Sequence, residues 1–172
     1  MILPDFMIAQ TLIRPESKPD DPSTWFSGPH RHIVEPFAPR TVQNGMSYGL
    51  SAAGYDVRSK QRECFYPGQF WLLSTLEHFW MPDDIVGFVH DKSTWARRGL
   101  AVQNTVIEPG WRGHLTLEVT SHARDGGAVI VEAGDPIAQI VFHKMAAPAQ
   151  SPYAGKYQDQ ADEPVKARHE QA

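Results

Sequence analysis

The chain has 172 residues, of which 21% are charged and 41% are hydrophobic, a composition typical of a soluble globular protein. Its length suits one domain, and we expect residues 1–172 to form it. The formal net charge of −4 argues against a general nucleic-acid-binding protein, because such proteins carry a basic surplus. The longest apolar runs fall well short of the ~20 residues that cross a bilayer, which argues against a membrane protein.

The lone cysteine, Cys64, excludes an internal disulfide framework and is compatible with a reducing compartment. The first residues, MILPDFMIAQTLI, lack the basic region and the small-residue cleavage site of a signal peptide. These two features favour a cytoplasmic protein.

The first elements in chain order are a short helix and a loop. The run FMIAQTLI predicts a helix over 6–13, with Asp5 as its N-cap and Pro15 marking its end. Residues 14–31 are rich in proline and turn formers, which predicts a loop.

From residue 33 onward, short apolar runs are broken by turn signals, a pattern typical of an all-β sandwich or barrel. In HLTLEVT, side chains at 115, 117 and 119 share one face of a strand, and those at 114, 116, 118 and 120 share the other. The polar stretch 161–172 predicts a loosely held tail. The expected strands lie within 32–37, 55–59, 69–75, 84–90, 99–107, 113–121, 127–134 and 136–145.

Motifs of several enzyme classes are absent from the sequence. The zinc motifs H-x-E, P-C-x-x-C and H-E-x-x-H do not occur, and neither do the P-loop, the dinucleotide-binding glycine motif or G-x-S-x-G. His30 and His32 form a close histidine pair without an evident further ligand. We therefore expect no zinc and no metal site built from protein side chains.

The segment DKSTWARRG (91–99) is the first of three clusters that could carry chemistry. Lys92, Ser93 and Thr94 place an ammonium group and two hydroxyls at the end of an expected strand, and Arg97 adds a planar donor fork. Such a turn can hold a phosphate chain. A solvated helical turn would have the same composition.

The other two clusters are Glu118 and the segment SPYAGKYQDQ (151–160). A carboxylate within an apolar strand suits proton transfer if a partly closed site raises its pKa, although the alternation also allows an outward-facing surface residue. Aromatic rings, a cation and an amide at Tyr153, Lys156 and Gln160 could close over a nucleotide, or belong to an ordinary polar tail.

Four segments, in order, resemble the dCTP deaminase family: NGMSYGLSAAGYDVRS, DKSTWARRGLAVQNTVIEPGWRGHLTLEVTS, GDPIAQIVF and SPYAGKYQDQ. The resemblance covers about residues 33–160. It implies a distorted, jelly-roll-like β-barrel of the dUTPase-like fold, assembled as a homotrimer with active sites between neighbouring subunits. Two departures are a short segment between Asp56 and Pro67 and the 14–31 loop, which matches no family segment.

The resemblance also implies a reaction, the metal-free hydrolysis of dCTP to dUTP and ammonia, which supplies dUTP for thymidylate synthesis. Glu118 would be the general base that activates water for attack on C4 of the cytosine, and Arg97 and Ser93 would complete the catalytic set. Mg²⁺ would arrive with the triphosphate rather than through a protein cage, and dTTP is a candidate effector. The implied substrate-binding residues are Lys92, Ser93 and Thr94 at the phosphates, Trp95, Ala96 and Arg97 beside them, Glu108 near the sugar, Thr116, Leu117 and Glu118 at the base, Gln139 at the nucleoside, and Tyr153, Lys156 and Gln160 in a C-terminal lid.

The nearest alternative is a dUTPase, because AAGYDVR and VIEPGWRG resemble motifs of that family too. Against it, the sequence lacks a glycine-rich, arginine-containing C-terminal motif, and Glu118 stands where dUTPases normally carry an apolar residue. A bifunctional enzyme that converts dCTP to dUMP and a non-catalytic nucleotide-binding regulator both stay open.

Overall fold

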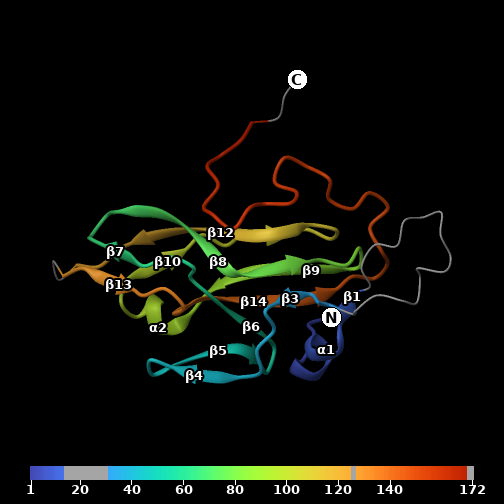
Figure 1. Cartoon of the computed structure of the whole chain (residues 1–172), viewed down its shortest axis with the longest axis horizontal. Coiled ribbons are helices and arrows are strands. Elements are labelled where there is room, and N and C mark those ends of the chain that lie inside the picture. The colour runs from blue at the N-terminus through green and yellow to red at the C-terminus, as the bar shows by residue number, and fades with distance from the viewer. Residues whose placement is uncertain (14–30, 125–126, 170–172) are drawn as a thin grey trace.

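The computed structural model describes residues 1–13, 31–124 and 127–169. Within these ranges the chain is mainly β, with two short helices, α1 (Asp5–Gln10) and α2 (Ser93–Ala96), which confirms the predicted fold class (Figure 1). Neither helix is long and apolar enough to cross a membrane. All of the predicted loop at 14–31 except its last residue, and with it His30, lies outside the described residues.

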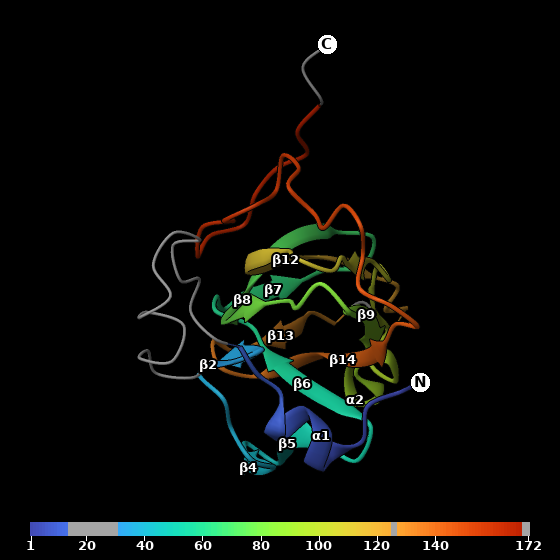
Figure 2. The ribbon, with the colours of Figure 1, turned by 90° about the vertical axis from the view of Figure 1, so that its right-hand side faces the viewer.

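Two larger antiparallel sheets form the body of the molecule (Figures 1 and 2). The four-stranded sheet has the order β10-β12-β8-β3, formed by Leu100–Val102, Arg112–Ser121, Phe70–Trp80 and Val34–Glu35. The six-stranded sheet has the order β11-β9-β14-β6-β5-β4, formed by Val106–Ile107, Ile85–Asp91, Pro136–Lys144, Gly54–Arg58, Met46–Ser51 and Thr41–Gln43. Two smaller pairs are β1 (Leu12–Ile13) with β2 (Arg31–His32), and β7 (Glu63–Phe65) with β13 (Val129–Val131).

Both large sheets contribute to one hydrophobic core. Leu73 and Leu117 from the four-stranded sheet and Val89, Ile140 and Phe142 from the six-stranded sheet are all fully buried in the same cluster. Burying each such side chain contributes about 1.5–3 kcal/mol to folding. The core therefore holds the two sheets together and fixes which side of each strand faces outward.

Strand β12 shows how the alternating pattern is realised. Leu117 and Val119 are buried in the core, and Glu118 is half-buried on the opposite face, as the alternation predicts. Leu115 departs from the alternation: it lines the same cavity as Glu118, although the pattern predicts that it faces the other side of the strand. The reason is an irregularity in the ladder between β12 and β8, where residues 75–77 of β8 bulge opposite Leu115.

The N-terminal helix is shorter than the apolar run predicts. Helix α1 ends at Gln10, and the two residues after Thr11 form strand β1 instead. Pro4 occupies the N-cap position, while the Asp5 carboxylate accepts a hydrogen bond from the amide of the next residue. Pairing of β1 with β2 thus overrides the local helical pattern.

Sequence inspection also missed the hairpin of β4 and β5 and joined two strands that are separate. The hairpin turns at Asn44 and Gly45, both with positive φ, and an Asn-Gly pair is a strong signal for such a turn. The predicted strand at 99–107 divides into β10, which pairs with β12, and β11, which pairs with β9. The chain passes from the four-stranded to the six-stranded sheet between β10 and β11, so one apolar run contributes a strand to each sheet.

Candidate active site

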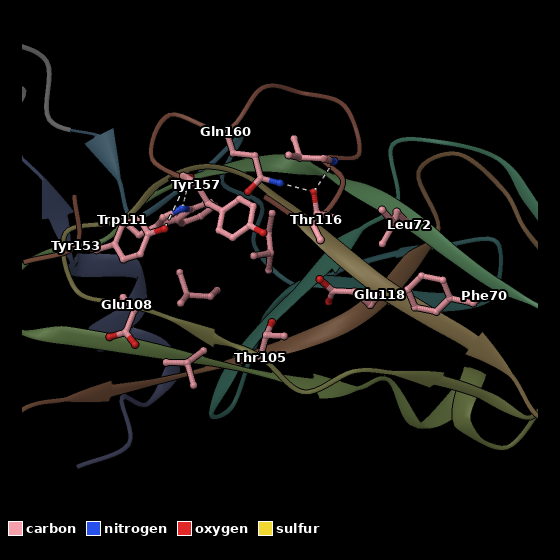
Figure 3. A pocket seen from close by; sticks show the side chains of 15 residues that line it. Phe70, Leu72, Thr105, Glu108, Trp111, Thr116, Glu118, Tyr153, Tyr157 and Gln160 are labelled. Carbon is pink, nitrogen blue, oxygen red and sulfur yellow. Dashed lines mark hydrogen bonds between the residues drawn. The ribbon is translucent and has the colours of Figure 1, made fainter. Parts of the chain in front are cut away.

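A cavity of about 390 Å³ lies between strands β12, β8 and β11 and the C-terminal segment (Figure 3). Its walls are mostly apolar, with a few polar groups among them. This is the usual character of a small-molecule site. The lining residues are Phe70, Leu72, Thr105, Val106, Ile107, Glu108, Trp111, Leu115, Thr116, Glu118, Tyr153, Tyr157, Gln160, Val165 and Ala167.

Glu118 is the carboxylate within this cavity, and it is poorly solvated. Its carboxylate is turned toward the side of the cavity where Thr105 and Thr116 lie (Figure 3). The Oε2 atom of Glu118 is buried and has no hydrogen-bond partner among the described residues. Burial raises the pKa of Glu118 above its ordinary value, and a hydrogen bond from its own backbone opposes the rise. A carboxylate in this state can accept a proton more readily than an exposed one.

The C-terminal segment, residues 151–169, closes one side of the cavity by folding back along β12. Gln160 forms a parallel bridge with Gly113, and Val165 donates its amide to the Thr116 hydroxyl oxygen at 3.0 Å. The side-chain amide of Gln160 donates to the same hydroxyl oxygen. Further bonds run from the Trp111 indole to the Tyr157 carbonyl at 2.7 Å, from the His114 amide to the Gln160 carbonyl at 3.0 Å, and from the Arg168 amide to the Tyr157 hydroxyl at 2.9 Å.

The polar composition of 161–172 predicts a loose tail, and the structure describes this stretch as far as residue 169. Residues 161–169 include Val165 and Ala167, which line the cavity. Asp162 also forms an ion pair with Lys60. Val165 is half-buried and Ala167 is exposed, and composition alone does not reveal that both line the cavity.

The predicted phosphate-binding turn, residues 92–97, lies outside this cavity. None of the described residues 92–97 lines the cavity. Ser93, Thr94 and Arg97 are exposed on and beside α2. The Lys92 ammonium is instead 2.8 Å from the Asp56 carboxylate, and both side chains are nearly buried. Burial raises the pKa of Asp56, and the hydrogen bond from Lys92 opposes this rise.

Five other residues of the predicted substrate-binding set, Trp95, Ala96, Leu117, Gln139 and Lys156, have side chains outside the cavity. Trp95 is buried, and its indole donates to the Pro136 carbonyl at 2.6 Å. Leu117 lies in the core, and Gln139 donates to the Ser51 hydroxyl at 3.0 Å. Lys156 places its ammonium 5.5 Å from the centre of the Tyr157 ring, and the small side chain of Ala96 is exposed.

Five predicted residues do meet in the cavity: Glu108, Thr116, Glu118, Tyr153 and Gln160. Sequence reasoning missed Thr105, Trp111 and the aromatic ring of Phe70 as cavity walls. Trp111 follows a proline-glycine turn, and a large aromatic there is a usable signal for an anchored loop. Among the described residues, no group of three or more histidines, cysteines or acidic side chains could hold a metal ion.

Solved structures with a similar fold include dUTPases. The dUTPase of phage phi11 of S. aureus superposes with a TM-score of 0.53 at 18% identity, over 73% of this chain and 94% of that one. The EIAV dUTPase gives a TM-score of 0.51 at 19% identity, over 62% of this chain and 87% of that one. At these identities the likeness defines the fold, and the chain has the dUTPase-like fold that the resemblance implied.

Sequence comparison identifies the family. A model described as dCTP deaminase-like matches residues 56–145. The dCTP deaminase of Campylobacter fetus is 33% identical over 161 residues, covering 74% of this chain and 86% of the relative. That of Metallosphaera sedula is 33% identical over 122 residues, covering 70% of this chain and 69% of the relative. The chain belongs to the dCTP deaminase-like family.

The close approach of the C-terminal segment to Gly113 can be tested by substitution. Gly113 has φ of +143°, and an added Cβ would lie 2.6 Å from the Gln160 nitrogen. We expect Gly113→Ala to push the segment away and to speed tryptic cleavage within 151–169 by about tenfold, the effect of ~1.4 kcal/mol of local opening.

Gly45→Ala is the matched control for this substitution. Gly45 also has a positive φ, of +75°, but an added Cβ there would meet nothing within 4 Å. Equal cleavage rates in the two variants would contradict the packing of Gln160 against Gly113.

Proposed function

We propose that the protein hydrolyses dCTP to dUTP and ammonia, with Glu118 as the general base. Glu118 takes a proton from a water molecule, and the water oxygen bonds to C4 of the cytosine. One proton passes to the ring nitrogen N3 and the other to the amino group, the bond between C4 and the amino nitrogen breaks, and ammonia leaves. The observation that carries this proposal is a carboxylate in a mostly apolar cavity, with one oxygen free of hydrogen bonds among the described residues and a raised pKa, in a chain of this family.

The other polar groups of the cavity suit a nucleoside. We assign Thr116 and Gln160 to the edge of the base and Glu108 to the sugar, because all three line the same cavity as Glu118. Tyr153 and Gln160 belong to the segment that closes it. Leu117 can contribute through its backbone, since its side chain lies in the core, whereas Gln139 donates its side chain to Ser51 and its backbone pairs with β6 and β9.

The triphosphate needs cationic donors, and no lysine or arginine is among the described residues that line this cavity in a single chain. We propose that Ser93, Thr94 and Arg97 of a neighbouring subunit supply them in a homotrimer. Two observations support this. The donors of the turn are exposed and outside the cavity of their own chain. Phe70 and Val106, which line the cavity, are 55% and 47% exposed, and a neighbouring subunit would cover such an apolar rim.

Magnesium enters the proposal as part of the substrate. The described side chains form no cluster that could hold a metal ion, whereas triphosphates bind Mg²⁺ through their own oxygens. The ion would neutralise charge on the phosphates while the protein's donors fix their position.

The products formed from dCTP and Mg²⁺ test the reaction. We expect ammonia and dUTP without pyrophosphate, and at least a ~10²-fold lower rate for Glu118→Gln, which keeps the shape but removes the base. Equilibrium dialysis should show that Glu118→Gln still binds dCTP. Pyrophosphate together with ammonia would indicate the bifunctional enzyme, pyrophosphate from dUTP alone a dUTPase, and no product a binding protein.

The pH dependence of kcat/KM tests the state of the base in the free protein. Glu118 acts only when ionised, and its raised pKa means that protonation begins at a higher pH than for an ordinary glutamate. We therefore expect kcat/KM to fall about tenfold per pH unit below an apparent pKa that lies above 4.5. Circular dichroism over the same range would confirm that the protein stays folded. A rate that stays constant down to pH 4.5 in folded protein would argue against Glu118 as the base.

A further inference from the structure

The Lys92 ammonium points away from the other donors of its turn. Ser93, Thr94 and Arg97 are exposed, whereas the Lys92 and Asp56 side chains are 10% and 9% exposed and lie 2.8 Å apart. An ion pair this well shielded is screened by salt far less than a surface pair. A lysine that contacted phosphate directly would instead have to leave this partner.

The ion pair joins the turn to a strand two positions away in the sheet. Lys92 directly follows β9, Asp56 lies in β6, and β14 runs between them. The side chain therefore reaches across β14, a span of roughly 9–10 Å at the usual strand spacing. A second tie holds the same turn, because the Trp95 indole donates to the Pro136 carbonyl at the start of β14.

The residues on either side of the turn are also fixed. The Asp91 carboxylate accepts a hydrogen bond from the Val102 amide at 2.7 Å, and the Gly99 carbonyl accepts one from the His122 amide at 2.6 Å. The turn is thus attached to both large sheets, and only its outward side chains are exposed. Donors that are fixed in advance bind with less loss of conformational entropy.

We propose that Asp56, through its ion pair with Lys92, is a positioning residue that fixes the Ser93, Thr94 and Arg97 donors, and that Lys92 is not itself a phosphate ligand. This rests on the proposed function, in which those three donors hold the triphosphate. It replaces the direct role that the family resemblance implied for Lys92 with an indirect one. It also gives Asp56, which sequence inspection had not assigned, a part in substrate affinity.

The two roles for Lys92 make opposite predictions for Asp56→Asn. If Lys92 contacts phosphate, neutralising Asp56 frees the ammonium, and dCTP binding stays the same or tightens. If Lys92 is held by Asp56 in order to place the turn, the same change loosens the turn and weakens dCTP binding. Deoxycytidine has no phosphate, so its affinity should stay nearly constant.

Binding is best measured by calorimetry in a Glu118→Gln host, which prevents turnover. We expect Asp56→Asn and Lys92→Met each to raise the Kd for dCTP about tenfold, with the Kd for deoxycytidine within about twofold. The double variant should also show about tenfold rather than a hundredfold, because the two residues act as one unit. Lys92→Arg keeps a cation opposite Asp56 and should restore most of the affinity.

The design separates the possible failures. Unchanged or tighter dCTP binding in Asp56→Asn would overturn the positioning role, and so would an equal loss for dCTP and deoxycytidine. A single variant could fail to fold because it leaves one buried charge unpaired. The double variant, Asp56→Asn with Lys92→Met, leaves no such charge. Unchanged dCTP binding in the double variant would also overturn the positioning role of Asp56. A host that binds no dCTP with Asp56 and Lys92 intact would instead contradict the proposed function.

Discussion

The two-sided character of β12 is the constraint on which the rest of the site depends. Leu117 and Val119 are buried in the core, so the register of this strand against β8 is fixed by hydrophobic packing. Successive side chains alternate, and Glu118 must then face the cavity. A slip of one residue would bury the carboxylate in the core and expose the leucine. The pairing of β12 with β8 therefore determines both the burial of Leu117 and Val119 in the core and the position of Glu118 in the cavity.

The cavity around Glu118 is assembled from segments that are distant in the sequence. The change of sheet between β10 and β11 brings Thr105 and Glu108 to one wall, and the C-terminal segment adds Tyr153 and Gln160 on the other side. Glycine at position 113 makes this possible, since any side chain there would collide with Gln160. Poor solvation of Glu118 follows from this enclosure and raises its pKa.

The α2 turn is equally well fixed but presents its donors away from its own cavity. Lys92 and Trp95 face inward and hold the turn, while Ser93, Thr94 and Arg97 face outward. If Glu118 is the base and these three donors hold the phosphates, as we propose, a complete site needs two copies of the chain. The proposed homotrimer is the arrangement that joins them.

Much of the fold and part of the site could be predicted from the sequence. Strong alternation located β12 and placed Glu118 on the face opposite Leu117, and apolar runs located β6, β8, β9 and β14. The predictions were less accurate where tertiary pairing decides the outcome, as at Leu12 and Ile13, which join a strand rather than a helix. Nor does composition distinguish a cation that faces a ligand from one that faces a buried carboxylate, as Lys92 does.

Activity of mixed assemblies tests most directly whether Glu118 and Arg97 act together across a subunit boundary. Glu118→Gln and Arg97→Ala should each be inactive alone. When equal amounts are unfolded and refolded together, random mixing in a trimer gives about a quarter of the sites both native residues. We expect dCTP deamination to recover to about that fraction of the wild-type rate. Native mass spectrometry that shows mixed trimers without any recovery of activity would contradict the shared site.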